Sequence, residues 1–192
     1  MRAEPAVKAM VREQVVGRRV RSRHVIGALL RVDRRVFVPA AHAAYALGDH
    51  PVSIACGQTV SQPYMVALML DALKVRRGMR VLEVGAGSGY VLALLSAMGA
   101  RPYGVEWRPE LASRIPANLS AARSGPVAVL CGDGGLGWPE EAPFDRILIS
   151  AACPFVPPPL LEQLAPGGIL VAPVDTPGGG VQVLRLMAKS PG

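Results

Sequence analysis

The sequence has little cysteine, few aromatic residues and no long apolar run, and each shortage excludes a class of protein. Of its 192 residues, three are Cys and 5% are aromatic. Cys56, Cys131 and Cys153 are odd in number and widely spaced, and the three histidines do not cluster with them. We therefore predict neither a disulfide framework nor a metal site. No stretch approaches the roughly 20 apolar residues of a membrane-spanning helix.

The rest of the composition is typical of a folded domain in a reducing compartment. A hydrophobic share of 51% excludes an intrinsically disordered protein. At roughly 150 residues per domain, the length predicts one compact domain. No signal-peptide pattern follows Met1, and isolated thiols are typical of the cytosol. We expect a cytoplasmic protein and take it to be a monomer.

Acidic residues are scarce at one end of the chain. Residues 1–36 hold ten of the 21 Lys and Arg but only three of the 14 Asp and Glu, so this segment carries the whole net charge of +7. Such a basic arm can bind nucleic acid, an acidic partner or an anionic membrane surface, or it can be a solvated helix face. Nucleic acid is not an expected partner, because reading bases requires residues beyond the charge.

The first third of the chain is predicted to be helical and then irregular. Apolar residues recur there at helical spacing: Val7, Met10, Val11 and Val15. Ser22 can cap a second short helix, and residues 36–39 are predicted to be extended. We assign residues 1–62 to a basic N-terminal helical segment with a long connection, and residues 63–192 to an α/β core.

From residue 63 onward, predicted helices and strands alternate. Pro63 suits the first turn of a helix through Leu73, with Ser61 or Gln62 as its cap. Strands are predicted at 80–84, 102–106, 127–130, 146–150, 168–174 and 181–187, with helices between them from Gly89, Pro109 and Pro159. This alternation implies βαβ units. We predict an α/β fold with a doubly wound, mostly parallel, Rossmann-like sheet and an N-terminal helical extension.

A glycine-rich turn at residues 85–89 follows the first predicted strand. Its G-x-G-x-G spacing is not the G-x-G-x-x-G of dinucleotide binding. Glycine lets a ligand approach the backbone closely, and a parallel sheet binds ligands beyond the carboxyl ends of its strands. An adenosine with an amino-acid tail can therefore lie across this turn. The candidate residues are Glu83, Gly85, Gly87, Ser88 and Gly89, although Glu83 can instead cap a helix or pair locally.

The next two predicted strands end in carboxylates. Glu106, 17 residues after Gly89, can accept hydrogen bonds from both ribose hydroxyls. Trp107 beside it can pack on an adenine or in the core. Asp133, in a Gly-Asp-Gly sequence, can accept from an adenine amino group or organise its own turn. Together with the glycine turn, these residues predict an adenosine site.

Several stretches are similar to one enzyme family: 35–39, 57–63, 81–90, 132–134 with 137–138 and 142–145, and 161–164 with 166–168. On these stretches the chain, from about residue 25 to 187, resembles the protein-L-isoaspartate (D-aspartate) O-methyltransferases, which are class I S-adenosylmethionine-dependent enzymes. Many methyltransferases share the glycine turn. The Gly-Gln-Thr-x-Ser-Gln-Pro sequence at 57–63 is much more specific for this family.

The resemblance implies a fold of the class I methyltransferase type, S-adenosyl-L-methionine as cofactor, and isoaspartyl-containing proteins or peptides as partners. Ser61 is the implied active-site hydroxyl, whereas the residues alone also allow it to cap the helix at Pro63. Glu106 and Trp107 are implied to hold the ribose and flank the adenine. The other residues implied to lie against cofactor or acceptor are Gln58, Thr59, Val60, Tyr64, Gly132 and Asp133.

The implied reaction needs few catalytic groups. The free carboxylate of an isoaspartyl residue has a pKa of roughly 3 to 4, so it is already ionised at pH 7 and needs no general base. Its methyl ester collapses to a succinimide, whose hydrolysis partly restores aspartate and so repairs the protein.

Two alternative functions stay open. One is a carboxyl methyltransferase for a dedicated peptide or small acid, suggested by Leu47, Ser53 and Ala55 in the acceptor-side loop; the other is a non-catalytic cofactor-binding module with a basic arm.

Overall fold

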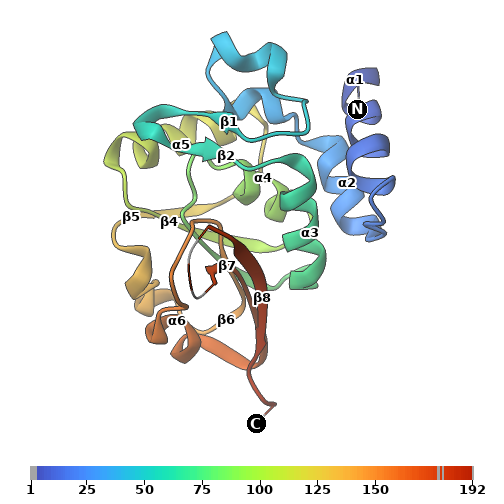
Figure 1. Cartoon of the computed structure of the whole chain (residues 1–192). Coiled ribbons are helices and arrows are strands. Elements are labelled where there is room, and N and C mark those ends of the chain that lie inside the picture. Colours follow the sequence, from blue (N-terminus) through green and yellow to red (C-terminus); the bar gives the residue numbers. More distant parts are fainter. Residues whose placement is uncertain (1–3, 177, 179, 192) are drawn as a thin grey trace.

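A six-stranded sheet forms the centre of the molecule, in the order β5-β4-β3-β6-β7-β8 (Figure 1). The computed structural model describes residues 4–176, 178 and 180–191. The strands are β3 (Arg80–Val84), β4 (Arg101–Glu106), β5 (Ala128–Cys131), β6 (Phe144–Ile149), β7 (Leu164–Asp175) and β8 (Gln182–Ala188). Neighbouring strands are parallel except for β7 and β8, which are antiparallel. The predicted α/β class with a mostly parallel sheet is confirmed.

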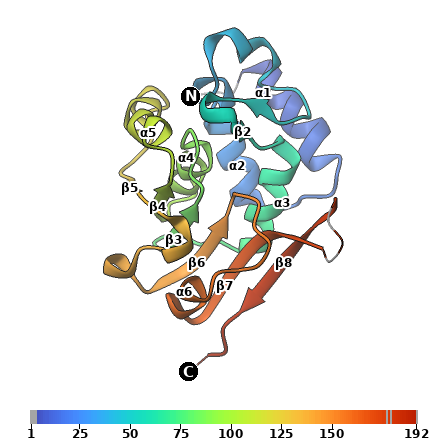
Figure 2. The same ribbon diagram turned by 60° about the vertical axis from the view of Figure 1, so that its left-hand side comes forward.

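Helices cover both faces of this sheet. One face carries α3 (Pro63–Leu73), α4 (Tyr90–Ala97) and α5 (Pro109–Ala121), and the other carries α6 (Pro158–Glu162). The N-terminal helices lie outside α3 and α4 (Figure 2). They are α1 (Pro5–Met10), which continues as the π-helical turn η1 (Val11–Val16), and α2 (Arg23–Arg31).

Alternation along the strands gives the sheet two apolar faces. Adjacent residues of a strand point to opposite faces, so Val81 and Leu82 of β3 join different clusters. Val81 belongs to the same apolar cluster as Leu70 of α3 and Leu94 of α4, whereas Leu82 belongs to the cluster that contains Leu160 of α6. The first cluster also holds the residues predicted from helical spacing: Val7, Met10, Val11 and Val15. The N-terminal helices therefore share a core with the α/β part.

The predictions for Ser22 and for residues 36–39 have different outcomes in the structure. Ser22 caps α2 as predicted, since its Oγ accepts a hydrogen bond from Val25 N at 3.4 Å. The prediction that residues 36–39 are extended is wrong for residues 36 and 37, because Arg34–Phe37 form a short 3-10 helix, η2. Asp33 starts that turn by accepting from Arg35 N at 2.9 Å.

The cap of α3 is Gln62, and neither Gln62 nor Ser61 makes a side-chain capping bond there. The predicted helix start at Pro63 is confirmed, while the alternative role of Ser61 as the cap is wrong. Proline at the first helical position has no N–H to satisfy and its φ is already helical, so this start does not depend on a capping side chain.

The long connection before α3 contains short elements. They are the 3-10 turns η3 (Ala40–Tyr45) and η4 (Ala55–Gly57) and the strands β1 (Val52–Ser53) and β2 (Thr59–Val60), which pair antiparallel. This pairing presents Thr59 and Ser61 to a cavity that Gly85 also lines. Within the described part of the chain, no helix combines the length and apolar character that a membrane crossing requires.

Candidate active site

The carboxyl ends of β3 and β6 open onto the main candidate site. These strands are neighbours, but the chain continues from β3 to β4 on one side and from β6 to β7 on the other. Such a reversal of strand order is where open α/β sheets bind ligands. A cavity of about 540 Å³ lies there. A smaller one of about 40 Å³ shares some of its lining, namely Thr59, Ser61, Gly85, Gly87 and Ser150.

Most of the predicted site residues line one or both cavities: Gln58, Thr59, Val60, Ser61, Glu83, Gly85, Gly87, Ser88, Glu106, Trp107 and Asp133. Three others do not. Gly89 instead lies at the N-cap of α4, and Gly132 N donates to the main-chain oxygen of Glu106 at 3.0 Å. Tyr64 lies under the guanidinium of Arg18, whose central carbon is 3.6 Å from the ring centroid, so the structure does not bring Tyr64 to the cavity.

The glycine turn needs glycine both for its backbone angles and for its surroundings. Gly85, Gly87 and Gly89 have φ values of +82°, +57° and +89°. A side chain at residue 85 would also place its Cβ 3.0 Å from the Cβ of Ala151, in the loop after β6. Glycine at residue 85 therefore lets the loops after β3 and β6 approach closely without crowding Ala151.

Glu106 connects the end of β4 to the glycine turn. The residue is buried, its Oε2 accepts from Gly87 N at 2.7 Å, and its Oε1 accepts from Arg108 N at 2.8 Å. A carboxylate oxygen can accept more than one hydrogen bond. The carboxylate therefore holds the turn and keeps acceptor capacity for hydroxyl groups of a ligand in the cavity.

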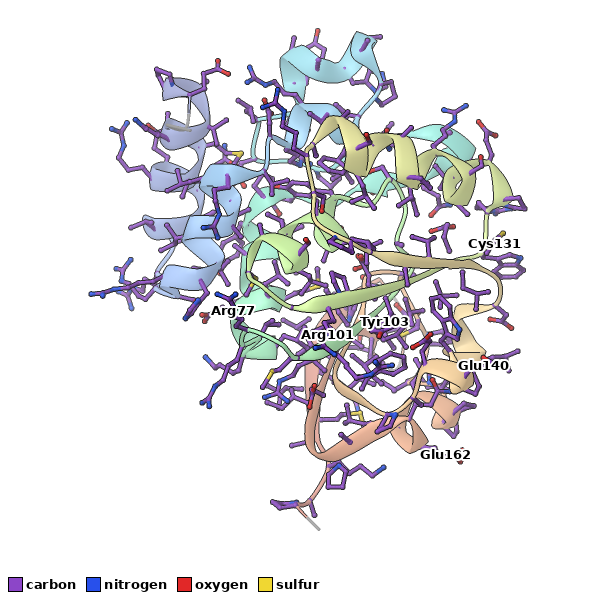
Figure 3. All side chains as sticks on the ribbon, turned by 180° about the vertical axis from the view of Figure 1, so that it is seen from behind. Arg77, Arg101, Tyr103, Cys131, Glu140 and Glu162 are labelled. Atoms are coloured by element: carbon purple, nitrogen blue, oxygen red, sulfur yellow. The ribbon has the colours of Figure 1, made fainter. Side chains whose placement is uncertain are left out.

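Trp107 and Asp133 lie at the ends of β4 and β5. Trp107 is 72% exposed, so its alternative placement in the core is wrong. Asp133 Oδ1 accepts from Gly135 N at 2.8 Å, which is the predicted turn-forming bond, and the residue also lines the cavity. Figure 3 shows Cys131 at this end of the sheet, opposite the end at which Arg77 and Arg101 lie.

Glu83 has one bonded and one unbonded carboxylate oxygen. Its Oε1 accepts from Ser150 Oγ at 2.7 Å, whereas Oε2 is buried with no hydrogen-bond partner among the described residues. Burial raises the pKa of Glu83 to about 8, and the nearby charge of Glu106 adds to this while the bond from Ser150 opposes it. Because Glu83 lines the smaller cavity, its free oxygen is suited to a cationic ligand group.

Ser61 lies where the two cavities meet. It lines both of them, as Thr59 does, and its Oγ makes no hydrogen bond to the described part of the chain. The next residue is held in place, since Gln62 Nε2 donates to Asp49 Oδ1 at 2.9 Å. The hydroxyl of Ser61 is therefore positioned by its backbone and available to a substrate.

Sequence reasoning missed the loop after β6. Residues 150–153 line the larger cavity, together with Arg108 and Pro157. The available signal was the end of a further parallel strand, since such ends meet at one edge of the sheet. Among the described residues, no group of three or more His, Cys, Asp or Glu is placed to hold a metal ion.

Relatives with known names resemble the chain over most of its length. A protein of Methylorubrum populi named protein-L-isoaspartate O-methyltransferase is 50% identical over 182 residues, covering 95% of this chain and 85% of that protein. A Marinobacter nauticus protein named protein-L-isoaspartate O-methyltransferase 2 is 48% identical over 183 residues, covering 95% of this chain and 84% of that protein.

Solved structures agree with these relatives. A Plasmodium falciparum structure described as a protein-L-isoaspartate O-methyltransferase in complex with S-adenosyl-L-homocysteine has a TM-score of 0.82 and 25% identity, and the match covers 97% of this chain and 91% of that one. A second protein-L-isoaspartate O-methyltransferase matches with a TM-score of 0.81 and 26% identity over 96% of this chain and 59% of that one. The model of the family described as protein-L-isoaspartate(D-aspartate) O-methyltransferase matches residues 5–192. The chain therefore belongs to the protein-L-isoaspartate(D-aspartate) O-methyltransferase family.

Proposed function

We propose that this chain transfers a methyl group from S-adenosyl-L-methionine to the free carboxylate of L-isoaspartyl residues in damaged proteins. The observation that carries the proposal is Ser61, whose hydroxyl has no hydrogen-bond partner among the described residues. Ser61 lines both cavities and lies within the family-specific sequence 57–63. Gly85 and Gly87 of the glycine turn line both cavities as well. A cofactor on the turn and an acceptor beside Ser61 would therefore meet there.

The residues at the cavity suit S-adenosyl-L-methionine. Glu106 offers carboxylate oxygens for the ribose hydroxyls, and the exposed ring of Trp107 offers an apolar face for the adenine. The buried Oε2 of Glu83, which has no partner in the described part of the chain, is an acceptor for the positively charged amino-acid end of the cofactor. When bound, the cofactor supplies an electrophilic methyl group.

The protein's part in the reaction is to bind and align. An isoaspartyl carboxylate is ionised at neutral pH, and no His or Lys is present among the described residues that line the two cavities. Ser61 Oγ can donate a hydrogen bond to this carboxylate and orient one of its oxygens toward the methyl group. Such alignment, with exclusion of water, accounts for much of the rate enhancement that a transfer of this kind needs.

An assay with two matched peptides tests the proposal. The enzyme is incubated with labelled S-adenosylmethionine and either an isoaspartyl peptide or its aspartyl twin. We expect base-labile label in the isoaspartyl peptide alone, and Ser61→Ala to lower kcat by about 10- to 100-fold, since one hydrogen bond to a charged group is lost. Ser120→Ala, on the exposed side of α5, serves as the control. Equal or absent label in the two peptides would contradict the proposal.

Trp107 provides a direct signal for cofactor binding. The chain has two Trp, and Trp138 is partly buried against Tyr103 while Trp107 is exposed. Covering Trp107 with adenine is expected to change its fluorescence when S-adenosylhomocysteine is added. In Trp107→Phe this change should disappear and Kd should rise about threefold to tenfold, through loss of stacking area. Trp138→Phe should keep the change, and an unchanged signal in Trp107→Phe would place the adenine elsewhere.

The cellular setting and assembly state are part of the same proposal. Three free thiols suit a reducing compartment, so we propose a cytoplasmic enzyme. We further propose that it acts as a monomer, for which sedimentation analysis of the purified chain is the test.

A further inference from the structure

Arg34 is completely buried, although the sequence places it within the basic N-terminal segment. Its guanidinium donates to backbone oxygens of two separate segments. Nη1 donates to Ala46 O, and Nη2 lies 3.2 Å from His50 O, 3.0 Å from Val60 O and 2.9 Å from Ser61 O. One side chain thus joins residues 46–50, early in the long connection, to residues 60–61 at its end, where the active-site hydroxyl lies.

No carboxylate in the described part of the chain neutralises this cation. Asp33 is adjacent, but its carboxylate accepts from the side chain of Arg35. Burial lowers the pKa of Arg34 below its ordinary value. Burying a cation without a carboxylate is costly, and apolar replacements of buried ionic groups are often equally stable. Stability alone is therefore a poor explanation for an arginine at this position.

The position of Ser61 depends on this anchoring. The Ser61 side chain has no hydrogen bond of its own within the described residues, so its hydroxyl is placed by the main chain that Arg34 holds. A parallel contact joins the same two segments, since Gln62 donates to Asp49. Asp49 is in turn paired with Arg18 at 3.0 Å, but that pair is exposed to water. The hydrogen bonds of Arg34 are shielded from water, so they hold the two segments together more firmly than this exposed pair does.

We propose that Arg34 is a positioning residue for methyl transfer, whose guanidinium holds the main chain of Val60 and Ser61 so that the Ser61 hydroxyl meets the acceptor carboxylate. The inference rests on the proposed function, because it assigns Arg34 a part in that reaction. The positioning role requires the planar guanidinium of Arg34, whose several N–H donors point in fixed directions. A lysine keeps the charge but is a compact ammonium group, which cannot reach both segments in the same way.

Arg34→Lys, compared with Arg35→Lys, tests the proposal. Arg35 is adjacent and partly exposed, and it pairs with Glu4 and Asp33 rather than with the site. We expect Arg34→Lys to lower kcat for the isoaspartyl peptide by about 100-fold, since a displacement on the order of 1 Å can cost this much. Kd for S-adenosylhomocysteine should rise by no more than about threefold, because the hydrogen bonds of Arg34 within the described residues go to residues 46–61 and not to Glu106 or Trp107. Arg35→Lys should retain the wild-type kcat.

Hydrogen exchange supplies a readout that does not depend on turnover. Backbone amides of residues 46–62 should exchange faster in Arg34→Lys than in the wild type, while those of the central strands stay protected. A kcat within threefold of the wild type, an equal loss in Arg35→Lys, or unchanged exchange at 46–62 would each overturn the inference. An inactive wild type would overturn the proposed function and the role of Arg34 in it, whereas an active wild type with an equally active Arg34→Lys would overturn the inference alone.

Discussion

Glu106→Gln is expected to weaken the binding of S-adenosylmethionine by on the order of 100- to 1000-fold. In the wild type the two carboxylate oxygens accept from Gly87 N and Arg108 N. The amide of glutamine replaces one acceptor with a donor, so one N–H loses its partner and the ribose loses a charged acceptor. Two hydrogen bonds to a charged group contribute about 3 to 4 kcal/mol together, which corresponds to this range in Kd.

Calorimetric titration with S-adenosylmethionine measures the effect directly. Glu140→Gln removes the same charge from an exposed residue that lines neither cavity, and should keep the wild-type Kd. Circular dichroism of each variant confirms that the fold is retained. A Kd for Glu106→Gln within threefold of the wild type would show that Glu106 shapes the turn without contacting the ribose.

Glu83→Gln is expected to remove a pH dependence of stability. The pKa of Glu83 rises from an ordinary value of 4.5 to about 8 in the fold, chiefly because the side chain is buried. The folded state therefore holds the proton more tightly, and this contribution to stability is fully present below pH 4.5 and lost as the pH rises through about 8. Within this window the free energy of unfolding of the wild type should fall by up to about 1.4 kcal/mol per pH unit relative to Glu83→Gln.

Urea unfolding of both proteins at pH 5.5, 6.5 and 7.5 measures the slope, with the exposed Glu162→Gln as a control that should parallel the wild type. Cofactor binding gives a second readout. A cationic cofactor favours the ionised carboxylate, so Kd for S-adenosylmethionine should fall with rising pH in the wild type, by up to about tenfold per unit, but not in Glu83→Gln. Parallel unfolding curves for wild type and Glu83→Gln would show that Glu83 is already ionised in the fold.

The order of the elements and the adenosine side of the site could be predicted from the sequence. Helical spacing placed the buried residues of α1, and prolines and glycines marked where helices begin and end. These signals act between residues a few positions apart, so they survive without knowledge of the rest of the chain. Glu106 could be placed beside the glycine turn because the carboxyl ends of parallel strands meet at one edge of the sheet.

The contacts that complete the site join distant residues. Glu83 meets Ser150 across 67 positions, and the loop after β6 approaches Gly85 closely. Tyr64 is the second residue of α3, next to the active-site segment, yet it lies under Arg18. A residue's neighbours along the chain do not specify which side chain from another segment will reach it.

Arg34 shows this difference most clearly. By composition it is one of ten cations in residues 1–36, and nothing nearby distinguishes it from the others. In the fold it is buried against carbonyl groups of residues 46–61, while its neighbour Arg35 remains partly exposed and paired with carboxylates. Local patterns reveal periodicity, turns and caps, because these depend on adjacent residues. Burial and hydrogen bonding of one particular side chain depend on which backbone groups the whole fold brings within about 3 Å of it.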